Sequence, residues 1–290
     1  MKKNSKVLNI IKIIWGVAVV AGGIYYVIKN YTTAIQYLSN ISPWKLLLAT
    51  VFIVLVRLMN VDMVQQSLVR IGWKPTFRSA FSFVSVSQLG KYIPGGVWQF
   101  VARFEAYKEA NITYKNMGKA FIIENVWRVI GCILISAAFI LFSQPVALLA
   151  KYNIDLSPQL MFLLAAILLV LWLLTVVICE FVFRQKGQPV SMGRVIYIFI
   201  SQIVLWFFYG ISFFCLFSKT GTFSDLLFTT GAISLSFIAG YVVIIAPGGI
   251  GVREAVTILL FSWMFSSSEI GIYAIVHRLL FTIAEFLLAG

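Results

Sequence analysis

Long apolar runs separated by short polar segments dominate the pattern of the chain. Runs long enough to cross a membrane occupy approximately residues 7–28, 44–68, 117–142, 159–183, 194–218 and 268–290. A hydrocarbon core about 30 Å thick needs roughly 20 apolar residues of α-helix. The pattern therefore predicts an all-α polytopic membrane protein, with about six full transmembrane helices in a single transmembrane domain over residues 1–290.

Two further apolar segments, at about 79–103 and 224–265, are interrupted near the middle. The interruptions have the same sequence, Pro94, Gly95 and Gly96 in the first and Pro247, Gly248 and Gly249 in the second. Backbone groups at membrane depth need hydrogen-bond partners, so a broken helix is tolerated only where protein or a wet cavity surrounds it. We expect both breaks to lie inside the helix bundle.

The basic residues indicate how the broken segments cross the membrane. The loop before the first segment holds Arg70, Lys74 and Arg78, and the loop after it holds Lys108, Lys115 and Lys119. Cytoplasmic loops are rich in Lys and Arg, so the chain is predicted to return to the cytoplasmic side in a re-entrant hairpin. With the N-terminus cytoplasmic, the second hairpin enters from the opposite side, and the units at about 79–142 and 224–290 form inverted repeats. Such repeats are typical of secondary transporters.

Composition supports a membrane location and narrows the function. The 290 residues are 61% hydrophobic and 11% charged, with a mean hydropathy of +0.95 and a formal net charge of +13. In a membrane chain this charge indicates orientation and attraction to anionic lipid, not nucleic acid. The three cysteines lie singly in apolar segments, and no nucleotide, metal or hydrolase motif is present. We expect no cofactor, no metal and no enzyme activity.

Several ionisable residues fall at membrane depth, where each costs on the order of 3 kcal/mol on insertion scales and normally pairs or serves a pathway. The basic ones are Arg57, Lys91, Arg128, Arg253 and Arg278. Glu124 and Arg128 are spaced i,i+4 and can pair on one helix face, as a stabilising pair or as part of a site.

The two breaks together suit a lipid phosphate. Glycines let the backbone approach a head group, and the half-helix after each break offers free N–H groups and a positive dipole end. A kinked helix explains either break taken alone, whereas the matched pair with cationic flanks favours a site. The predicted head-group site comprises Lys91, Pro94, Gly95, Gly96, Trp98, Gln99, Arg103, Glu124, Arg128, Pro247, Gly248, Gly249, Gly251, Arg253, Glu254, Arg278 and Glu285.

At these residues the sequence resembles the lysylphosphatidylglycerol synthase transmembrane-region family, which includes the flippase half of bacterial multiple peptide resistance factors. The stretch from Ala246 to Glu254 looks like the family's Pro-Gly-Gly-x-Gly-x-x-Glu signature. Glu124 with Arg128, and Arg278 with Glu285, look like two of its charged pairs. Many members carry Glu and Arg directly after the first Pro-Gly, where this chain has Val97-Trp98-Gln99.

The resemblance implies a lipid flippase of the bacterial inner membrane. The expected substrate is an anionic phospholipid, an aminoacyl-phospholipid or a lipid-linked glycan precursor. One alternative is a membrane scaffold that presents lipid to a partner glycosyltransferase or lipid synthase, and another is a membrane-embedded transferase. Short loops and a large apolar surface permit a homodimer.

Overall fold

The computed structural model describes residues 31–39, 41–92, 97–185, 187–217, 221–243 and 247–289. These residues form helices and connecting loops, and no strand occurs among them. Six helices are long and apolar enough to cross a membrane, which confirms the all-α polytopic fold. They are α3 (Pro43–Arg70), the continuous run Tyr114–Phe142, α9 (Pro158–Val182), α10 (Met192–Phe214), α11 (Phe223–Val242) and α13, whose apolar part is Ser267–Leu288.

The remaining helical elements are short. They are α2 (Tyr31–Ser39), α4 (Phe77–Leu89), the 3₁₀ turn η1 (Gly90–Tyr92), α5 (Trp98–Glu109), α8 (Val146–Lys151), the 3₁₀ turn η3 (Pro247–Gly249) and α12 (Val252–Phe261). Within the run Tyr114–Phe142, the helices α6 (Tyr114–Asn125) and α7 (Gly131–Phe142) are joined by a π-helical segment, η2 (Val126–Ile130). The α13 helix itself extends over Ser267–Ala289.

Five of the six predicted spans coincide with observed helices, and the sixth, at 7–28, lies outside the described residues. The structure shows one candidate span that was not predicted as such, α11, which is the first arm of the second broken segment. At 20 residues and about 1.5 Å per residue, α11 is long enough to cross a membrane alone. The second broken segment is therefore a full-length helix followed by a short one, instead of two equal halves.

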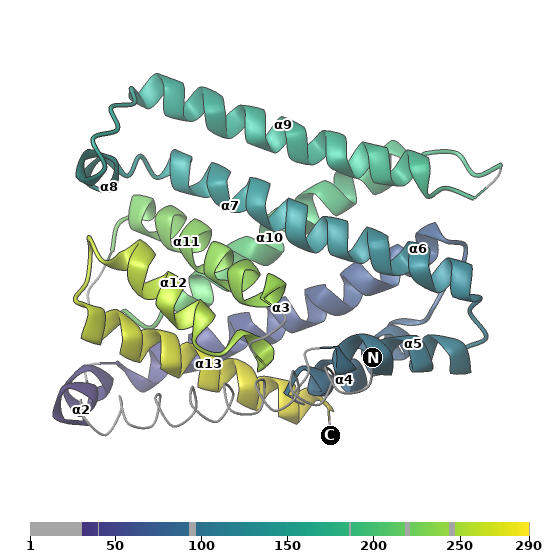
Figure 1. Cartoon of the computed structure of the whole chain (residues 1–290), viewed down its shortest axis with the longest axis horizontal. Coiled ribbons are helices and arrows are strands. Elements are labelled where there is room, and N and C mark those ends of the chain that lie inside the picture. The colour runs from purple at the N-terminus through teal and green to yellow at the C-terminus, as the bar shows by residue number, and fades with distance from the viewer. Residues whose placement is uncertain are drawn as a thin grey trace, which may run out of the picture.

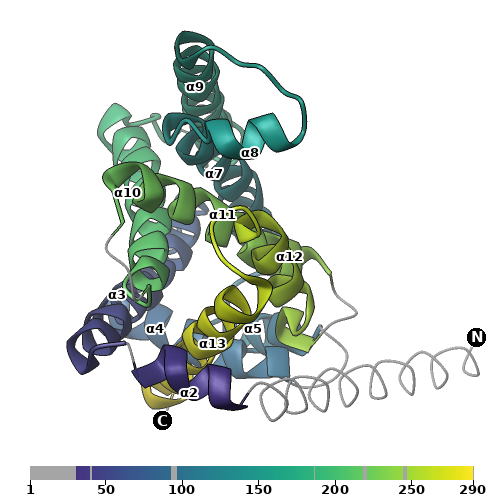
Figure 2. The same cartoon turned by 90° about the vertical axis from the view of Figure 1, so that its left-hand side faces the viewer.

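Close helix packing at small residues builds the bundle (Figures 1 and 2). The α11 helix packs against α7 and α10, α7 packs against α9, and α3 packs against α10. A Cβ atom at Gly231 of α11 would lie 2.4 Å from the carbonyl oxygen of Ser136 on α7. A Cβ atom at Gly210 of α10 would lie 2.1 Å from Oγ1 of Thr230 on α11. Small residues at such crossings let helix backbones approach closely, as is typical of membrane bundles.

The first broken segment folds back on itself. Its arms, α4 with 13 residues and α5 with 12, are each about 20 Å long or less, too short to cross a membrane, and they pack against one another. At the closed end, a Cβ atom on Gly90 would lie 2.6 Å from the backbone nitrogen of Gln99, so only glycine fits there. The central Pro94-Gly95-Gly96 lies outside the described residues.

The two hairpins open toward opposite ends of the bundle (Figure 1). The connections into α4 and out of α5 lie at the end where α9 turns into α10. The connections into α11 and out of α12 lie at the other end. This arrangement is the one expected for inverted units at 79–142 and 224–290, whose repeat relation and re-entrant nature stay predictions.

A buried ion-pair network joins three long helices near the α9–α10 end. Glu180 on α9 is fully buried and receives Arg70 of α3 at 2.9 Å and Arg194 of α10 at 3.0 Å. Arg194 also donates to the side-chain oxygen of Gln66 at 2.7 Å. Arg70, predicted from the sequence to lie in a basic loop, therefore fastens helices together with Arg194.

Candidate functional site

The two helix breaks meet inside the bundle, where η1 lies against η3. Gly248 and Gly249 of η3 have φ values of 58° and 72°, a left-handed backbone conformation that favours glycine. The carbonyl oxygen of Gly248 accepts a hydrogen bond from Nη2 of Arg278 at 2.9 Å. The described parts of the two breaks lie against one another. Gly249 is buried, as expected for a break inside the bundle, whereas Val97 and Trp98 after the first break and Val242 and Val243 before the second are exposed.

A cavity lies beside this junction, with about 790 Å³ of empty space when its opening is included. Its charged lining consists of four cationic side chains and a single carboxylate, from Arg57, Lys91, Arg128, Arg253 and Glu285. Glu285 of α13 is buried and pairs with Lys91 of η1 and, at 3.1 Å, with Nη1 of Arg57 on α3. One carboxylate therefore holds the first break, the last helix and α3 together.

Arg253 differs from the other cations of the cavity because its side chain forms no ion pair or hydrogen bond with the described residues. Its guanidinium carbon lies 4.2 Å from the centroid of the Phe237 ring on α11. The side chain passes Gly240, where a Cβ atom would lie 2.3 Å from its Cγ. Glycine at position 240 thus leaves room for the Arg253 side chain, which lines the cavity without an ion-pair partner among the described residues.

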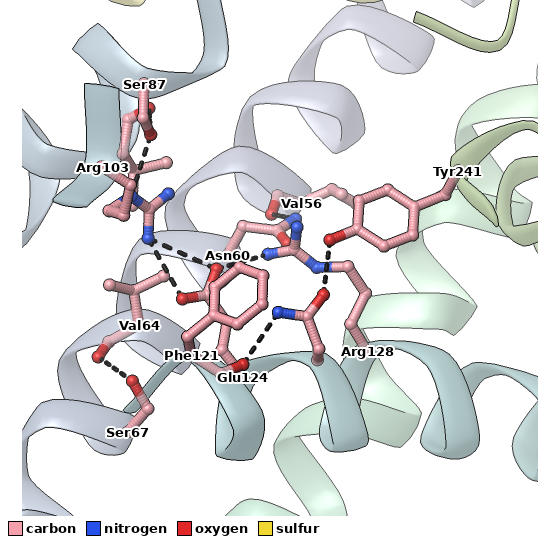
Figure 3. Close-up of polar contacts among 12 residues, drawn as sticks. Val56, Asn60, Val64, Ser67, Ser87, Arg103, Phe121, Glu124, Arg128 and Tyr241 are labelled. Atoms are coloured by element: carbon pink, nitrogen blue, oxygen red, sulfur yellow. Dashed lines mark hydrogen bonds and ion pairs between the residues drawn. The ribbon is translucent and has the colours of Figure 1, made fainter. Parts of the chain in front are cut away.

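One flank of the cavity is a cluster around Glu124 (Figure 3). Its carboxylate pairs with Arg103 of α5 at 3.2 Å and with Arg128 of η2 at 3.1 Å. Arg103 also donates to Oγ of Ser87 on α4 at 2.9 Å. The predicted i,i+4 pair between Glu124 and Arg128 is confirmed. The cluster ties the second arm of the first hairpin to the following span.

The other flank is a similar pair with its charges exchanged. Glu254 of α12 accepts from Nη1 of Arg278 on α13 at 2.8 Å. Its second oxygen accepts from the backbone nitrogen of Gly251 at 2.7 Å and caps the start of α12. Each hairpin therefore fixes its second arm to the next long helix through one arginine–glutamate pair, since Arg103 and Glu124 do the same for the first hairpin.

The structure brings most, but not all, of the predicted site residues together. Lys91, Gln99, Arg128, Gly248, Gly249, Arg253 and Glu285 line the cavity itself. Arg103 and Glu124 line one adjoining pocket, and Glu254 and Arg278 line another. Trp98 lines none of these pockets, and its side chain is 46% exposed. Gly251 caps α12, Pro247 begins η3, and Pro94, Gly95 and Gly96 lie outside the described residues.

Several lining residues were absent from the predicted set. Arg57 carried a signal, since it is an arginine within an apolar span, and its partner Glu285 is far away in sequence. Asn60 and the ring of Tyr241 carried none, because helix-borne polar and aromatic residues are common at any depth of such a bundle.

Comparison with known proteins identifies the family of this chain. The family model described as the lysylphosphatidylglycerol synthase TM region matches residues 13–289. The chain belongs to this family. No curated protein matches it. Membership in the family, together with six candidate membrane-spanning helices, establishes a multi-pass membrane protein with a lipid-related role.

Across the cavity and its two flanks, cations outnumber carboxylates. Six cationic side chains, from Arg57, Lys91, Arg103, Arg128, Arg253 and Arg278, face three carboxylates, from Glu124, Glu254 and Glu285. Each of the three carboxylates already accepts from at least one of these cations. In a family whose role concerns lipids, such an excess at the meeting point of two helix breaks is suited to an anionic head group.

Proposed function

We propose that this protein is a flippase that moves an anionic or glycosylated phospholipid between the leaflets of a bacterial inner membrane. The observation that carries the proposal is the guanidinium of Arg253, which lines the cavity at the paired helix breaks without an acidic partner in the described structure. A buried cation is costly unless a counter-charge accompanies it. A lipid phosphate supplies that counter-charge.

The energetics favour a head-group role for the cavity over a purely structural one. Two unit charges about 4 Å apart attract by roughly 4 kcal/mol at an effective dielectric constant of 20. The pairs at Glu124, Glu254 and Glu285 already secure that stabilisation for their own cations. Arg253 has no carboxylate within ion-pair distance among the described residues, so an anion that enters the cavity would supply the close contact that the other cations already have.

The distribution of basic residues supports an orientation. At the end where α9 turns into α10 lie Lys74, Arg78, Lys108, Lys115, Lys119 and Arg184, whereas Lys45 and Lys151 lie at the other end of the described chain. The positive-inside rule then places the α9–α10 end in the cytoplasm. The first hairpin opens to that side and the second to the outer side, so each leaflet has a hairpin through which a head group reaches the junction.

Transport is tested with the purified full chain in proteoliposomes that contain a fluorescent phosphatidylglycerol in both leaflets. A membrane-impermeant quencher then reports the rate at which lipid exchanges between leaflets. We expect the unmodified protein to accelerate exchange, and Arg253→Gln to slow it at least tenfold, equivalent to about 1.4 kcal/mol.

The matched control is Arg184→Gln, which removes an exposed arginine that stacks 4.3 Å from the Phe181 ring and lines none of the three pockets. This variant should exchange lipid at the unmodified rate. No acceleration by the unmodified protein, or an unchanged rate for Arg253→Gln, would contradict the proposed transport. Stoichiometric retention of lipid without exchange would favour a protein that presents lipid to a partner.

A further inference from the structure

The cavity contains a second set of polar groups that the proposed phosphate contact does not use. These are uncharged and come from Asn60, Gln88, Gln99, Trp206 and Tyr209. The side chains of Gln88 and Gln99 form no hydrogen bond within the described residues. The indole nitrogen of Trp206 is buried and has no hydrogen-bond partner there, and the residue as a whole is only 3% exposed.

Asn60 and Tyr209 complete this neutral set. The amide nitrogen of Asn60 donates to the carbonyl oxygen of Val56 at 2.9 Å, which leaves its side-chain oxygen as an acceptor. The hydroxyl of Tyr209 forms no hydrogen bond with the part of the chain that is described, and its ring packs edge-on against Trp206 and Phe237. The indole nitrogen of Trp206 is the fully buried, unpaired member of this set, and a buried polar group without a partner is costly. Asn60, Gln88 and Gln99 are half-buried around it, so that the set offers both donors and acceptors to a ligand.

In contrast to the neutral groups, the three carboxylates of the cavity and its flanks are already engaged by other protein groups. Both oxygens of Glu254 are engaged, one by Arg278 and the other by the backbone of Gly251. Glu124 receives two arginines, and Glu285 receives Lys91 and Arg57. An ammonium group entering the cavity would meet an excess of positive charge, and each carboxylate that could receive it is already held by a cation. Like charges disfavour such a ligand, whereas hydroxyl groups carry no such penalty.

We infer that the cavity selects lipids whose phosphate bears an uncharged, hydroxyl-rich substituent such as glycerol or a sugar, and that it discriminates against head groups carrying an ammonium group. This inference rests on the proposed function, since it specifies the ligand of the same site. Arg253 binds the phosphate, while the carboxamides and the Tyr209 hydroxyl bind the hydroxyl groups. Specificity arises from the repulsive cations as much as from the neutral partners.

Binding is measured separately from transport. The full chain is placed in phosphatidylcholine nanodiscs doped with one test lipid, and bound lipid is quantified by native mass spectrometry. The test lipids are phosphatidylglycerol, phosphatidic acid, phosphatidylethanolamine and lysyl-phosphatidylglycerol. We expect phosphatidylglycerol to bind at least tenfold more tightly than the two ammonium lipids, and more tightly than phosphatidic acid, which has the phosphate without the hydroxyl-bearing group.

A charge insertion then tests the cause of the selectivity. Gln99→Glu and, independently, Gln88→Glu each add a carboxylate to the cavity lining and should raise the affinity for lysyl-phosphatidylglycerol relative to phosphatidylglycerol at least fivefold. Gln159→Glu makes the same chemical change at an exposed position near the start of α9 and should leave the ratio unchanged. Thermal unfolding of each variant verifies that it is folded, and either cavity variant suffices.

The outcomes separate the two proposals. Selective binding whose ratio shifts with Gln99→Glu or Gln88→Glu supports the inferred specificity, even if leaflet exchange is absent. The absence of leaflet exchange would refute the proposed transport and leave the specificity standing. Equal binding of phosphatidylglycerol and the ammonium lipids overturns the inferred specificity, and it does so even where exchange is rapid and transport stands. Selective binding whose ratio moves in neither cavity variant also overturns it, because the selectivity would then originate outside this cavity.

Discussion

The Gly240→Ala substitution tests whether the crossing of α11 and α12 positions Arg253. A methyl group at residue 240 would lie 2.3 Å from Cγ and 2.7 Å from Nε of Arg253. Non-bonded carbon atoms pack at about 3.5–4.0 Å, so the arginine side chain must move by more than an ångström. We expect the guanidinium to leave its position over Phe237 and the cavity to lose its unpaired charge.

The magnitude follows from opposing contributions. Overpacking a buried contact costs about 1–3 kcal/mol, and a cation–π contact with Phe237 contributes about 0.5–2 kcal/mol. Alanine in place of glycine inside a helix returns roughly 0.5–1 kcal/mol. The losses exceed this gain, so the free energy of unfolding should fall by about 0.5–4.5 kcal/mol. Lipid exchange should slow about as much as in Arg253→Gln.

The assay pairs thermal unfolding in detergent with the leaflet-exchange measurement. Gly118→Ala is the matched control, because no described atom lies within 4 Å of a Cβ atom built at that position of α6. It should be neutral or slightly stabilising and exchange lipid normally. A Gly240→Ala variant as stable and as active as Gly118→Ala would refute the argument that this glycine creates the path of Arg253.

Three further predictions concern the charged network and the topology. Glu124→Gln removes the carboxylate shared by two buried arginines and should lower the free energy of unfolding by about 3–5 kcal/mol. Glu105→Gln breaks an exposed pair with Lys108 and should lower it by no more than about 1 kcal/mol. Denaturant unfolding measures both variants. Glu180→Gln should destabilise the α3, α9 and α10 helices by about 3–5 kcal/mol without changing the ratio of lipids bound, and a changed ratio would show that the network reaches the cavity. The orientation is tested by single cysteines in a variant that lacks the natural ones. Lys115→Cys should react with a membrane-impermeant thiol reagent only from the cytoplasmic side, and Lys151→Cys only from the outer side. The reverse pattern would exclude the proposed orientation.

The structure also explains why residues that look equivalent in sequence have different roles. Arg278 and Glu285 lie on one helix, seven positions apart, and resemble a local pair. They bind different elements instead, since Arg278 receives Glu254 of α12, whereas Glu285 holds Lys91 of η1 and Arg57 of α3. The last helix, α13, thereby connects both breaks, and we expect substitutions of its charged residues to affect both hairpins.

Local sequence determined the spans, the breaks and the pairs within one helix. Apolar runs of about 20 residues specify helices that satisfy their own backbone in lipid, and the spacing of Glu124 and Arg128 specifies a contact because residues four apart share a helix face. Both features depend only on neighbours along the chain, so pattern alone predicts them. The same holds for Gly248 and Gly249, whose positive φ values follow from the turn they occupy.

Tertiary structure alone decided which charges are compensated. The pairs Lys91–Glu285 and Arg103–Glu124 join residues 194 and 21 positions apart, and no periodicity specifies them. Arg253 resembles the other membrane-depth cations in sequence, yet it is left without an acidic partner among the described residues because the three nearby carboxylates are held by other cations. Sequence supplied six cations and three acids near two breaks. Their pairing, and therefore the charge available to a ligand, depends on helix packing.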